Sequence, residues 1–258
     1  GLVASATPER HVICYSAAEG AFRSFSRIEE VVGAGSVTEA ALALVAGSAA
    51  PAPAPSPGGA PGRQDGGVRD VLVCTHGRRD RCCGSLGTVL ADELAAELGA
   101  GKGDLPAGVR LWRTSHTGGH RFAPSVIVLP EGTVWGLLDR EGLTMVLRRR
   151  GPAGEVLGGY RGCSGLPRRE LQALEREAIA ELGWDVLDAA RAGSLEALPE
   201  DSWSRASLDL AWDDGRRAAF RAEVGIGRRV PIPDCGLPVE QSFKTEQELS
   251  VRLLERTA

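Results

Sequence analysis

The sequence lacks any apolar run long enough to cross a bilayer, which takes about 20 residues in a helix. Its first residues also lack the basic-then-apolar order of a secretory signal. An excess of charge of one sign is missing too, since 30 Lys and Arg residues stand against 34 Asp and Glu residues. These absences argue against a membrane or a nucleic acid as the partner. We therefore expect a globular protein of the cytoplasm.

Cysteine and histidine are scarce but clustered. Six cysteines among 258 residues are too few for a disulfide scaffold, and there are only four histidines. Half of the cysteines lie in CTHGRRDRCCG, residues 74–84, and half of the histidines lie in HTGGH, residues 116–120. Both segments therefore concentrate side chains that bind metal ions.

The composition divides the chain into four segments. Residues 47–67 are nearly all Gly, Ala, Pro and Ser, which predicts an extended linker because such a stretch buries little apolar surface. Residues 1–46 hold one predicted strand, RHVICYS, and one predicted helix, SVTEAALALVAG. Because this is too little for an independent domain, we expect it to pack on the core domain at residues 68–158. A C-terminal module covers residues 159–258. We also expect that Gly1 is not the native start, since the only methionine is Met145.

The predicted core domain alternates strands with helices. Its expected elements are a buried strand ending at Cys74, a helix over 88–99, a strand over 109–114, a hairpin over 125–139 that turns at Pro130–Gly132, and a helix capped by Asp139. This order predicts an α/β fold.

The C-terminal module has a different pattern. Leu171, Leu174, Ala178 and Leu182 form the apolar stripe of a helix. Two alternating apolar runs then flank Asp214 and Gly215, which is a strong hairpin signal. We expect a small helix-plus-hairpin unit of the α+β type.

The clustered thiols and imidazoles follow the two predicted strands of the core. Cys74 ends the first strand, Cys83 lies at the entry to the next helix, and His116 and His120 follow the second strand. If the two strands are neighbours in a parallel or mixed sheet, these groups meet at one edge and can hold a metal. The C-x8-C spacing is wider than the two to four residues that separate cysteines in a zinc knuckle.

The spacing C-x8-C followed by H-x3-H resembles that of thioredoxin-like [2Fe-2S] ferredoxins, which have a second cysteine pair where this chain has histidines. The segments VCTHGRRDRCCG, SHTGGHRFAPSVIVLPEGTVWG and YRGCSGLP resemble the sucrase/ferredoxin-like family over about residues 10–185. This resemblance implies a thioredoxin-like ferredoxin core with the helix-plus-hairpin module appended. It also implies a [2Fe-2S] cluster held by Cys74, Cys83, His116 and His120. Cys82 competes locally with Cys83 for the second position.

The implied ligand set predicts an electron carrier rather than a stand-alone enzyme. Two thiolates and two neutral imidazoles carry less negative charge than four thiolates, so the potential should be higher than that of a plant-type ferredoxin. A ligating imidazole also keeps a second ring nitrogen that can gain or lose a proton, so we expect electron transfer to be proton-coupled. The partner would be a redox protein, either a reductase or an acceptor enzyme. Arg78, Arg79 and Arg81 are either its docking site or a solvated basic loop.

Two alternative functions remain at this stage. One is a structural zinc protein. The other is a thiol–disulfide oxidoreductase that uses Cys74 with Cys83 or Cys82 with Cys83, although the chain has no C-x-x-C motif. The chain also lacks a dinucleotide-binding glycine fingerprint and a carboxylate pair for glycoside hydrolysis. The remaining cysteines and histidines are expected to be structural: Cys14, Cys163, Cys235, His11 and His76.

Overall fold

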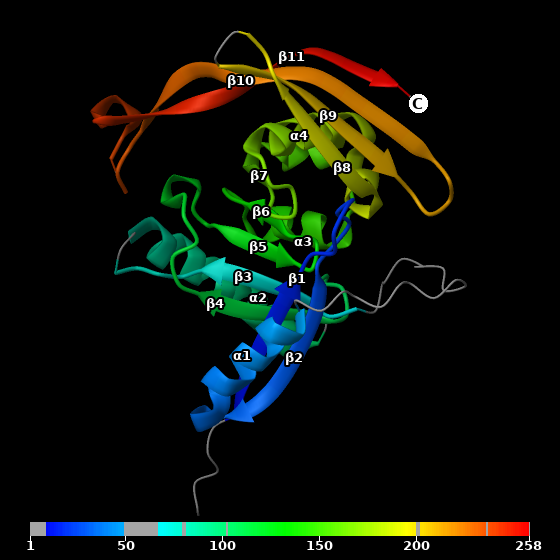
Figure 1. The fold of residues 1–258 in the computed structure, drawn as a ribbon. Helices are drawn as coiled ribbons and strands as arrows, with labels where there is room; N and C mark the ends of the chain where they lie inside the picture. Colours follow the sequence, from blue (N-terminus) through cyan, green and yellow to red (C-terminus); the bar gives the residue numbers. More distant parts are fainter. Residues whose placement is uncertain are drawn as a thin grey trace, which may run out of the picture.

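The computed structural model describes residues 9–48, 67–78, 81–101, 103–199, 202–235 and 237–257. Most of the predicted linker at 47–67 lies outside the described residues, as does Arg79. Figure 1 shows two larger sheets with a helix between them and a separate N-terminal hairpin. No helix within these ranges has the length and apolar character needed to span a membrane.

A five-stranded sheet forms the core, with the order β4-β3-β5-β6-β7. Its strands are β3 (Arg69–Cys74), β4 (Val109–Thr114), β5 (Val126–Leu129), β6 (Thr133–Trp135) and β7 (Tyr160–Cys163). β3 runs parallel to β4, and the other neighbours are antiparallel. The two predicted strands and the predicted hairpin are confirmed. β7 lies just beyond the expected domain boundary at residue 158, which itself stays a prediction.

Two helices complete this core. α2 (Thr88–Ala100) connects the parallel strands β3 and β4, and α3 (Arg140–Arg148) follows β6. The Asp139 carboxylate accepts a hydrogen bond from the Gly142 amide at 2.8 Å and caps α3, as the sequence predicted. The resulting βαβ unit, followed by an antiparallel hairpin and a helix, is the thioredoxin-like arrangement that the family resemblance implied.

The N-terminal segment is a hairpin with a helix. Strands β1 (Glu9–Ser16) and β2 (Ser26–Gly33) pair antiparallel, and α1 (Val37–Ser48) follows them. The strand and helix predicted here are confirmed, whereas β2 was not predicted. Its sequence, SRIEEVVG, places two glutamates and two adjacent valines where a half-buried strand would alternate polar and apolar residues.

The C-terminal module is a four-stranded antiparallel sheet on a helix. The helix α4 (Arg169–Leu182) contacts β7 of the first sheet and β9 and β10 of the second, so it lies between the sheets (Figure 1). The sheet has the order β11-β10-β9-β8, with β8 (Ala190–Ala197), β9 (Trp203–Ala211), β10 (Arg217–Ile232) and β11 (Lys244–Thr257). The predicted helix and the predicted β9–β10 hairpin are confirmed. β8 pairs with β9 and β11 pairs with β10, which extends the hairpin to a four-stranded sheet.

One continuous apolar core joins these parts. It contains Val73 and Trp135 of the first sheet, Leu174 of α4 and Phe220 of β10. Short 3-10 helices connect the larger elements at Ala34–Ser36, His120–Phe122, Ala153–Glu155, Leu157–Gly159, Gly183–Asp188 and Val239–Gln241.

Candidate metal centre

The described part of the cysteine segment, residues 74–78 and 81–84, folds back against the end of β3. Cys74 is the last residue of β3, and its amide donates a hydrogen bond to the Ser125 carbonyl at 2.9 Å. Cys83 begins a π-helical turn, Cys83–Gly87, that leads into α2. Cys74 and Cys83 are each only 1% exposed and pack together with Ala123. The structure therefore buries these two residues in one small cluster.

Close backbone contacts hold this loop in place. A Cβ atom on Gly87 would lie 2.0 Å from the Cys74 carbonyl oxygen, and one on Gly84 would lie 2.3 Å from the Gly77 Cα atom. Both neighbours are backbone atoms, which cannot move aside as a flexible side chain can. Glycine at these two positions is thus what lets the loop close tightly around Cys83.

The histidine segment starts at the same edge of the sheet. Cys74 is the register partner of Thr114, the last residue of β4, and the Thr75 amide donates to the Thr114 carbonyl at 3.1 Å. His116 follows two residues later, and its Nδ1 atom is buried. The prediction that the two segments emerge from neighbouring strands at one edge is confirmed.

The HTGGH loop turns by positive backbone angles. Gly118 and Gly119 have φ values of 85° and 68°, a region that glycine enters without steric cost. His120 then begins the 3-10 helix His120–Phe122. The sharp turn directs His120 back toward the cysteine segment, where its carbonyl accepts a hydrogen bond from the Cys82 thiol at 3.1 Å.

Cys82 does not share the position of its neighbour Cys83. Its Sγ atom lies 3.7 Å from His120 Nδ1 and 2.8 Å from the Sγ atom of Cys235, which lies 3.2 Å from the same nitrogen. All three side chains are half-buried. Burial, together with the hydrogen bond and charge of Cys235, raises the pKa of Cys82 to about 11.

Cys235 is the residue of this site that sequence reasoning missed. It was expected to be structural, and the structure instead brings it from the connection between β10 and β11 onto His120. Cys235 is 115 residues from His120 along the chain, so no local spacing relates the two. In Figure 1 the β10–β11 connection reaches the side of the molecule where the loops after β3 and β4 lie.

Positive charge surrounds the histidine loop. The guanidinium groups of Arg121 and Arg161 lie 4.5 and 4.4 Å from the ring centroid of Phe122. Burial, and then the charge of Arg121, lowers the pKa of Arg161 from its usual value. Arg121 also pairs with Glu246 of β11, which ties this loop to the C-terminal sheet. Arg78 and Arg81 on the cysteine loop are exposed.

The other candidate residues lie elsewhere. Cys14 is half-buried in β1, and Cys163 is buried in β7, where burial raises the pKa of its thiol to about 11. His11 bonds Glu29 at 2.6 Å. The Nδ1 atom of His76 is buried and has no hydrogen-bond partner among the described residues. None of the six cysteines, all within the described ranges, forms a disulfide.

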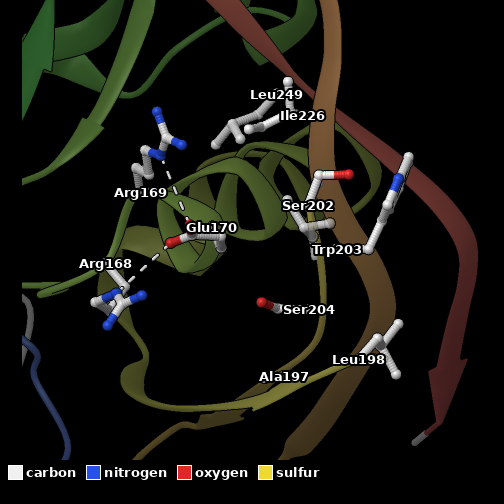
Figure 2. Close-up of a pocket in the computed structure, with 12 residues that line it drawn as sticks. Arg168, Arg169, Glu170, Ala197, Leu198, Ser202, Trp203, Ser204, Ile226 and Leu249 are labelled. Atoms are coloured by element: carbon white, nitrogen blue, oxygen red, sulfur yellow. Dashed lines mark ion pairs between the residues drawn. The ribbon is translucent and has the colours of Figure 1, made fainter. Parts of the chain in front are cut away.

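A separate cavity of about 290 Å³ lies in the C-terminal module (Figure 2). It is bounded by the start of α4 and by strands β9 and β10, with Arg168, Glu170 and Trp203 among its lining residues. Arg168 and Arg169 both pair with Glu170, which leaves one net positive charge on these three lining side chains. No cysteine or histidine is among the described residues that line it.

A family of known proteins matches the part of the chain that contains the cysteine and histidine segments. The family model for sucrase/ferredoxin-like proteins matches residues 12–162, which is more than half of the chain. The chain belongs to the sucrase/ferredoxin-like family. This family match covers most of the N-terminal hairpin, the whole cysteine and histidine loops and most of the five-stranded sheet.

Individual relatives of this family member are more distant. A protein of Debaryomyces hansenii named altered inheritance of mitochondria protein 32 is 39% identical over 67 residues, which span 26% of this chain and 23% of the yeast protein. Two solved structures of a thioredoxin-like [2Fe-2S] ferredoxin from Aquifex aeolicus, one of them a cysteine variant, are 15% identical. They cover 32% and 39% of this chain and 85% and 96% of the ferredoxin, with TM-scores of 0.25 and 0.28.

Proposed function

We propose that this chain binds a [2Fe-2S] cluster through Cys74, Cys83, His116 and His120 and acts as an electron-transfer protein. One observation carries the proposal. The parallel register of β3 and β4 brings the ends of both strands to one edge of the sheet, so the cysteine and histidine loops start side by side. Membership of the sucrase/ferredoxin-like family supports the same ligand set.

The chemistry of the donors fits such a group. Thiolates and imidazoles are the side chains that hold [2Fe-2S] clusters in proteins. Cys74 and Cys83 are buried in one cluster, and neither forms a disulfide. The absence of side chains at Gly84 and Gly87 allows the backbone of their loop to pack closely. Two buried thiols next to a histidine loop would shield a bound cluster from water.

The burial of the two neighbouring cysteines favours Cys83 over Cys82 as the second thiolate ligand. Cys83 is 1% exposed and packs with Cys74, whereas Cys82 is half-buried and turns toward Cys235. Adjacent residues in a helical turn point in different directions, so they cannot both serve the same pocket.

The bound cluster would accept and donate one electron at a time. Two neutral imidazoles leave the ligand set less negative than four thiolates do, which raises the potential. Arg121 and Arg161 add positive charge beside the histidine loop and favour the reduced, more negative state. The ring nitrogen that does not bind iron can hold a proton, so the potential should fall as the pH rises, and a flat potential between about pH 6 and 9 would contradict this coupling.

The exchange partner would be a redox protein, either a reductase or an acceptor enzyme, in the cytoplasm. Arg78 and Arg81 are exposed on the cysteine loop and would attract an acidic docking surface. An attraction of this kind should weaken as the ionic strength rises.

The test is a visible and EPR spectrum of the full chain, purified without oxygen and reconstituted with iron and sulfide. We expect a red-brown protein with two irons and two sulfides per chain. Cys74→Ser, Cys83→Ser and His116→Ala should each lose or alter the spectrum, because each removes a ligand. Cys14→Ser, in β1, is the matched control and should leave the spectrum unchanged.

The same preparation separates the two alternatives. A colourless chain that takes up no iron or sulfide, and that loses its bound zinc ion in Cys74→Ser, would favour a structural zinc protein. A thiol–disulfide oxidoreductase would keep its activity after His116→Ala, since thiol exchange needs no imidazole pair.

A further inference from the structure

A second group of metal-binding side chains adjoins the proposed cluster ligands. Cys82 Sγ, Cys235 Sγ and His120 Nδ1 all lie within 4.8 Å of one another. They come from three separate parts of the chain: the cysteine loop, the β10–β11 connection and the histidine loop. We propose that Cys82, Cys235 and His120 form a second metal site, which shares His120 with the proposed cluster ligands and takes Zn²⁺.

The geometry is close to that of a zinc site. With Zn–S bonds of about 2.3 Å and Zn–N bonds of about 2.0 Å, tetrahedral ligands lie about 3.5–3.8 Å apart. The distances from His120 Nδ1 to the two sulfurs, 3.7 and 3.2 Å, are near this range. The two sulfurs, 2.8 Å apart, need to separate by about 1 Å to hold the ion between them. Cys235 lies in a connection between strands, where a shift of this size costs little.

The kind of donor selects the kind of ion. Two thiolates and one imidazole are soft ligands that suit zinc and disfavour Mg²⁺ and Ca²⁺, which prefer oxygen. Three protein ligands leave the fourth position of a tetrahedral ion open. Because all three side chains are half-buried, the ion can enter from the solvent and keep water or a small thiol as its fourth ligand.

The surroundings hold the three donors together without the ion. Cys82 Sγ donates to the His120 carbonyl at 3.1 Å, and Arg121, the residue after His120, pairs with Glu246 at the start of β11. The C-terminal module is thus tied to the histidine loop at Glu246, which follows Cys235 in the chain. A disulfide between Cys82 and Cys235 would need no histidine, yet His120 Nδ1 contacts both sulfurs.

His120 belongs to this site and to the proposed cluster ligands, so full occupation by zinc should exclude the cluster. The zinc site itself does not depend on the proposed function, because Cys82 and Cys235 belong only to the second group. A chain that assembles the cluster but binds no zinc would overturn the second site alone. A chain that binds zinc through Cys82 and Cys235 but never assembles a cluster would overturn the proposed function alone.

The test is zinc binding by the metal-free full chain, kept reduced and anaerobic, in competition with a coloured zinc chelator. We expect one Zn²⁺ per chain. Cys82→Ser and Cys235→Ser should each weaken binding by at least about tenfold, since even an outer hydrogen-bond partner of a zinc ligand is worth about 10–100-fold. Cys14→Ser and Cys74→Ser should bind zinc as the unaltered chain does.

Alkylation of the unaltered chain provides a second measurement that needs no variant. Zn²⁺ should protect Cys82 and Cys235 from iodoacetamide, read residue by residue from fragment masses, while the reactivity of Cys14 stays the same. Zinc binding that is lost in Cys74→Ser but kept in Cys235→Ser would overturn the proposal, because the ion would then occupy the cluster ligands. No zinc bound under reducing conditions, or protection of Cys74 and Cys83 instead, would overturn it as well.

Discussion

Glu175 of α4 and Arg191 of β8 form a charge pair that is fully removed from water. Arg191 Nη1 donates to Glu175 Oε1 at 2.5 Å, and the Tyr160 hydroxyl donates to Glu175 Oε2 at 2.5 Å. Both charged side chains are 0% exposed. Burial, and then the charge of Glu175, raises the pKa of Tyr160 well above its usual value, so the phenol stays a donor.

Removing one member of this pair should be costly. Glu175→Ala leaves the Arg191 charge buried without its carboxylate, and we expect the free energy of unfolding in urea to fall by about 3–5 kcal/mol. Glu196→Ala is the control, since Glu196 pairs with Arg205 on an exposed surface, where such pairs contribute under about 1 kcal/mol. Equal losses in both variants would mean that the buried pair contributes no more than an exposed one.

His116 allows a test of the ligand charge. If His116 binds iron, His116→Cys replaces a neutral ligand by a thiolate, and we expect the reduction potential to fall by on the order of 100 mV. Spectroelectrochemical titration of the reconstituted protein measures this shift. Cys14→Ser should keep the original potential, and an unchanged potential in His116→Cys would remove His116 from the ligand set.

The sequence correctly predicted that the cysteine and histidine segments follow two neighbouring strands, whereas the ligand set itself stays a prediction. Cys74, Cys83, His116 and His120 stand out by their spacing, and the structure puts their segments at one sheet edge. Cys235 could not be found in this way because Cys82, its contact, is 153 residues away. Glu175 and Arg191 also escaped, since the helical pattern of α4 reveals which face is buried but not that a charge on it has a partner in another element.

At the scale of elements, the N-terminal hairpin is held on the core by charged groups. Asp70 of β3 is 1% exposed and accepts hydrogen bonds from Tyr15 of β1, from Arg27 Nε of β2 at 2.7 Å and from Trp112 Nε1 of β4 at 2.5 Å. Burial alone would raise the pKa of Asp70, but these hydrogen bonds outweigh it and lower the pKa below its usual value. Glu29 of β2 joins the same group through a hydrogen bond from Arg110, which lowers its pKa strongly.

This arrangement predicts a specific loss of stability in acid. A carboxyl group whose pKa is lowered by folding stabilises the protein above its unfolded pKa, about 4, and this contribution disappears as the pH falls through the folded value. Asp70→Asn should therefore lower the free energy of unfolding by about 2–3 kcal/mol at pH 7 and should flatten its dependence on pH below about 4. Urea unfolding between pH 7 and pH 3 measures both effects. Asp209→Asn, at an exposed carboxylate of β9, should follow the unaltered protein throughout.

Elements were predictable where one physical pattern dominated. The buried strand β3, the Pro130–Gly132 turn and the Asp139 cap each have a strong local signal, and each is confirmed. β11 has none, because its sequence KTEQELSVRLLERT is rich in charge and mostly exposed. It is stabilised by pairing with β10 and by ion pairs across the strands, such as Arg252 with Glu223, which the strand's own sequence does not reveal.

At the scale of the whole molecule, the connection between β1 and β2 joins all three parts of the chain. The backbone of Phe22 exchanges two hydrogen bonds of 2.8 Å with Arg191 of β8, and the Phe25 amide donates to the Pro130 carbonyl of the core. The Phe22 ring is 5% exposed and packs against Phe25 at 4.9 Å. This small aromatic cluster therefore lies where the N-terminal hairpin, the core and the C-terminal sheet meet.

Gly165 shows how tightly that junction is packed. A Cβ atom at Gly165 would lie 2.2 Å from Phe22 Cζ and 2.3 Å from Phe22 Cε1, and a rigid ring cannot yield to it. We expect Gly165→Ala to lower the free energy of unfolding by about 1–3 kcal/mol. Gly154→Ala is the matched control, because nothing lies within 4 Å of its Cβ position, and it should change stability by less than about 0.5 kcal/mol. In a Phe22→Leu background the loss at Gly165 should shrink, since the two sites share a contact.

His120 and Cys235 are 115 residues apart in the chain, so His120 is synthesised well before Cys235. On a ribosome that adds about 5–20 residues per second, the segment with Cys74, Cys83, His116 and His120 emerges several seconds before Cys235 is made. During that interval the only thiols available near His120 are those of the segment already made. Iron delivered to the nascent chain would meet Cys82 but not yet Cys235, whereas a chain released without iron would already contain both of these thiols.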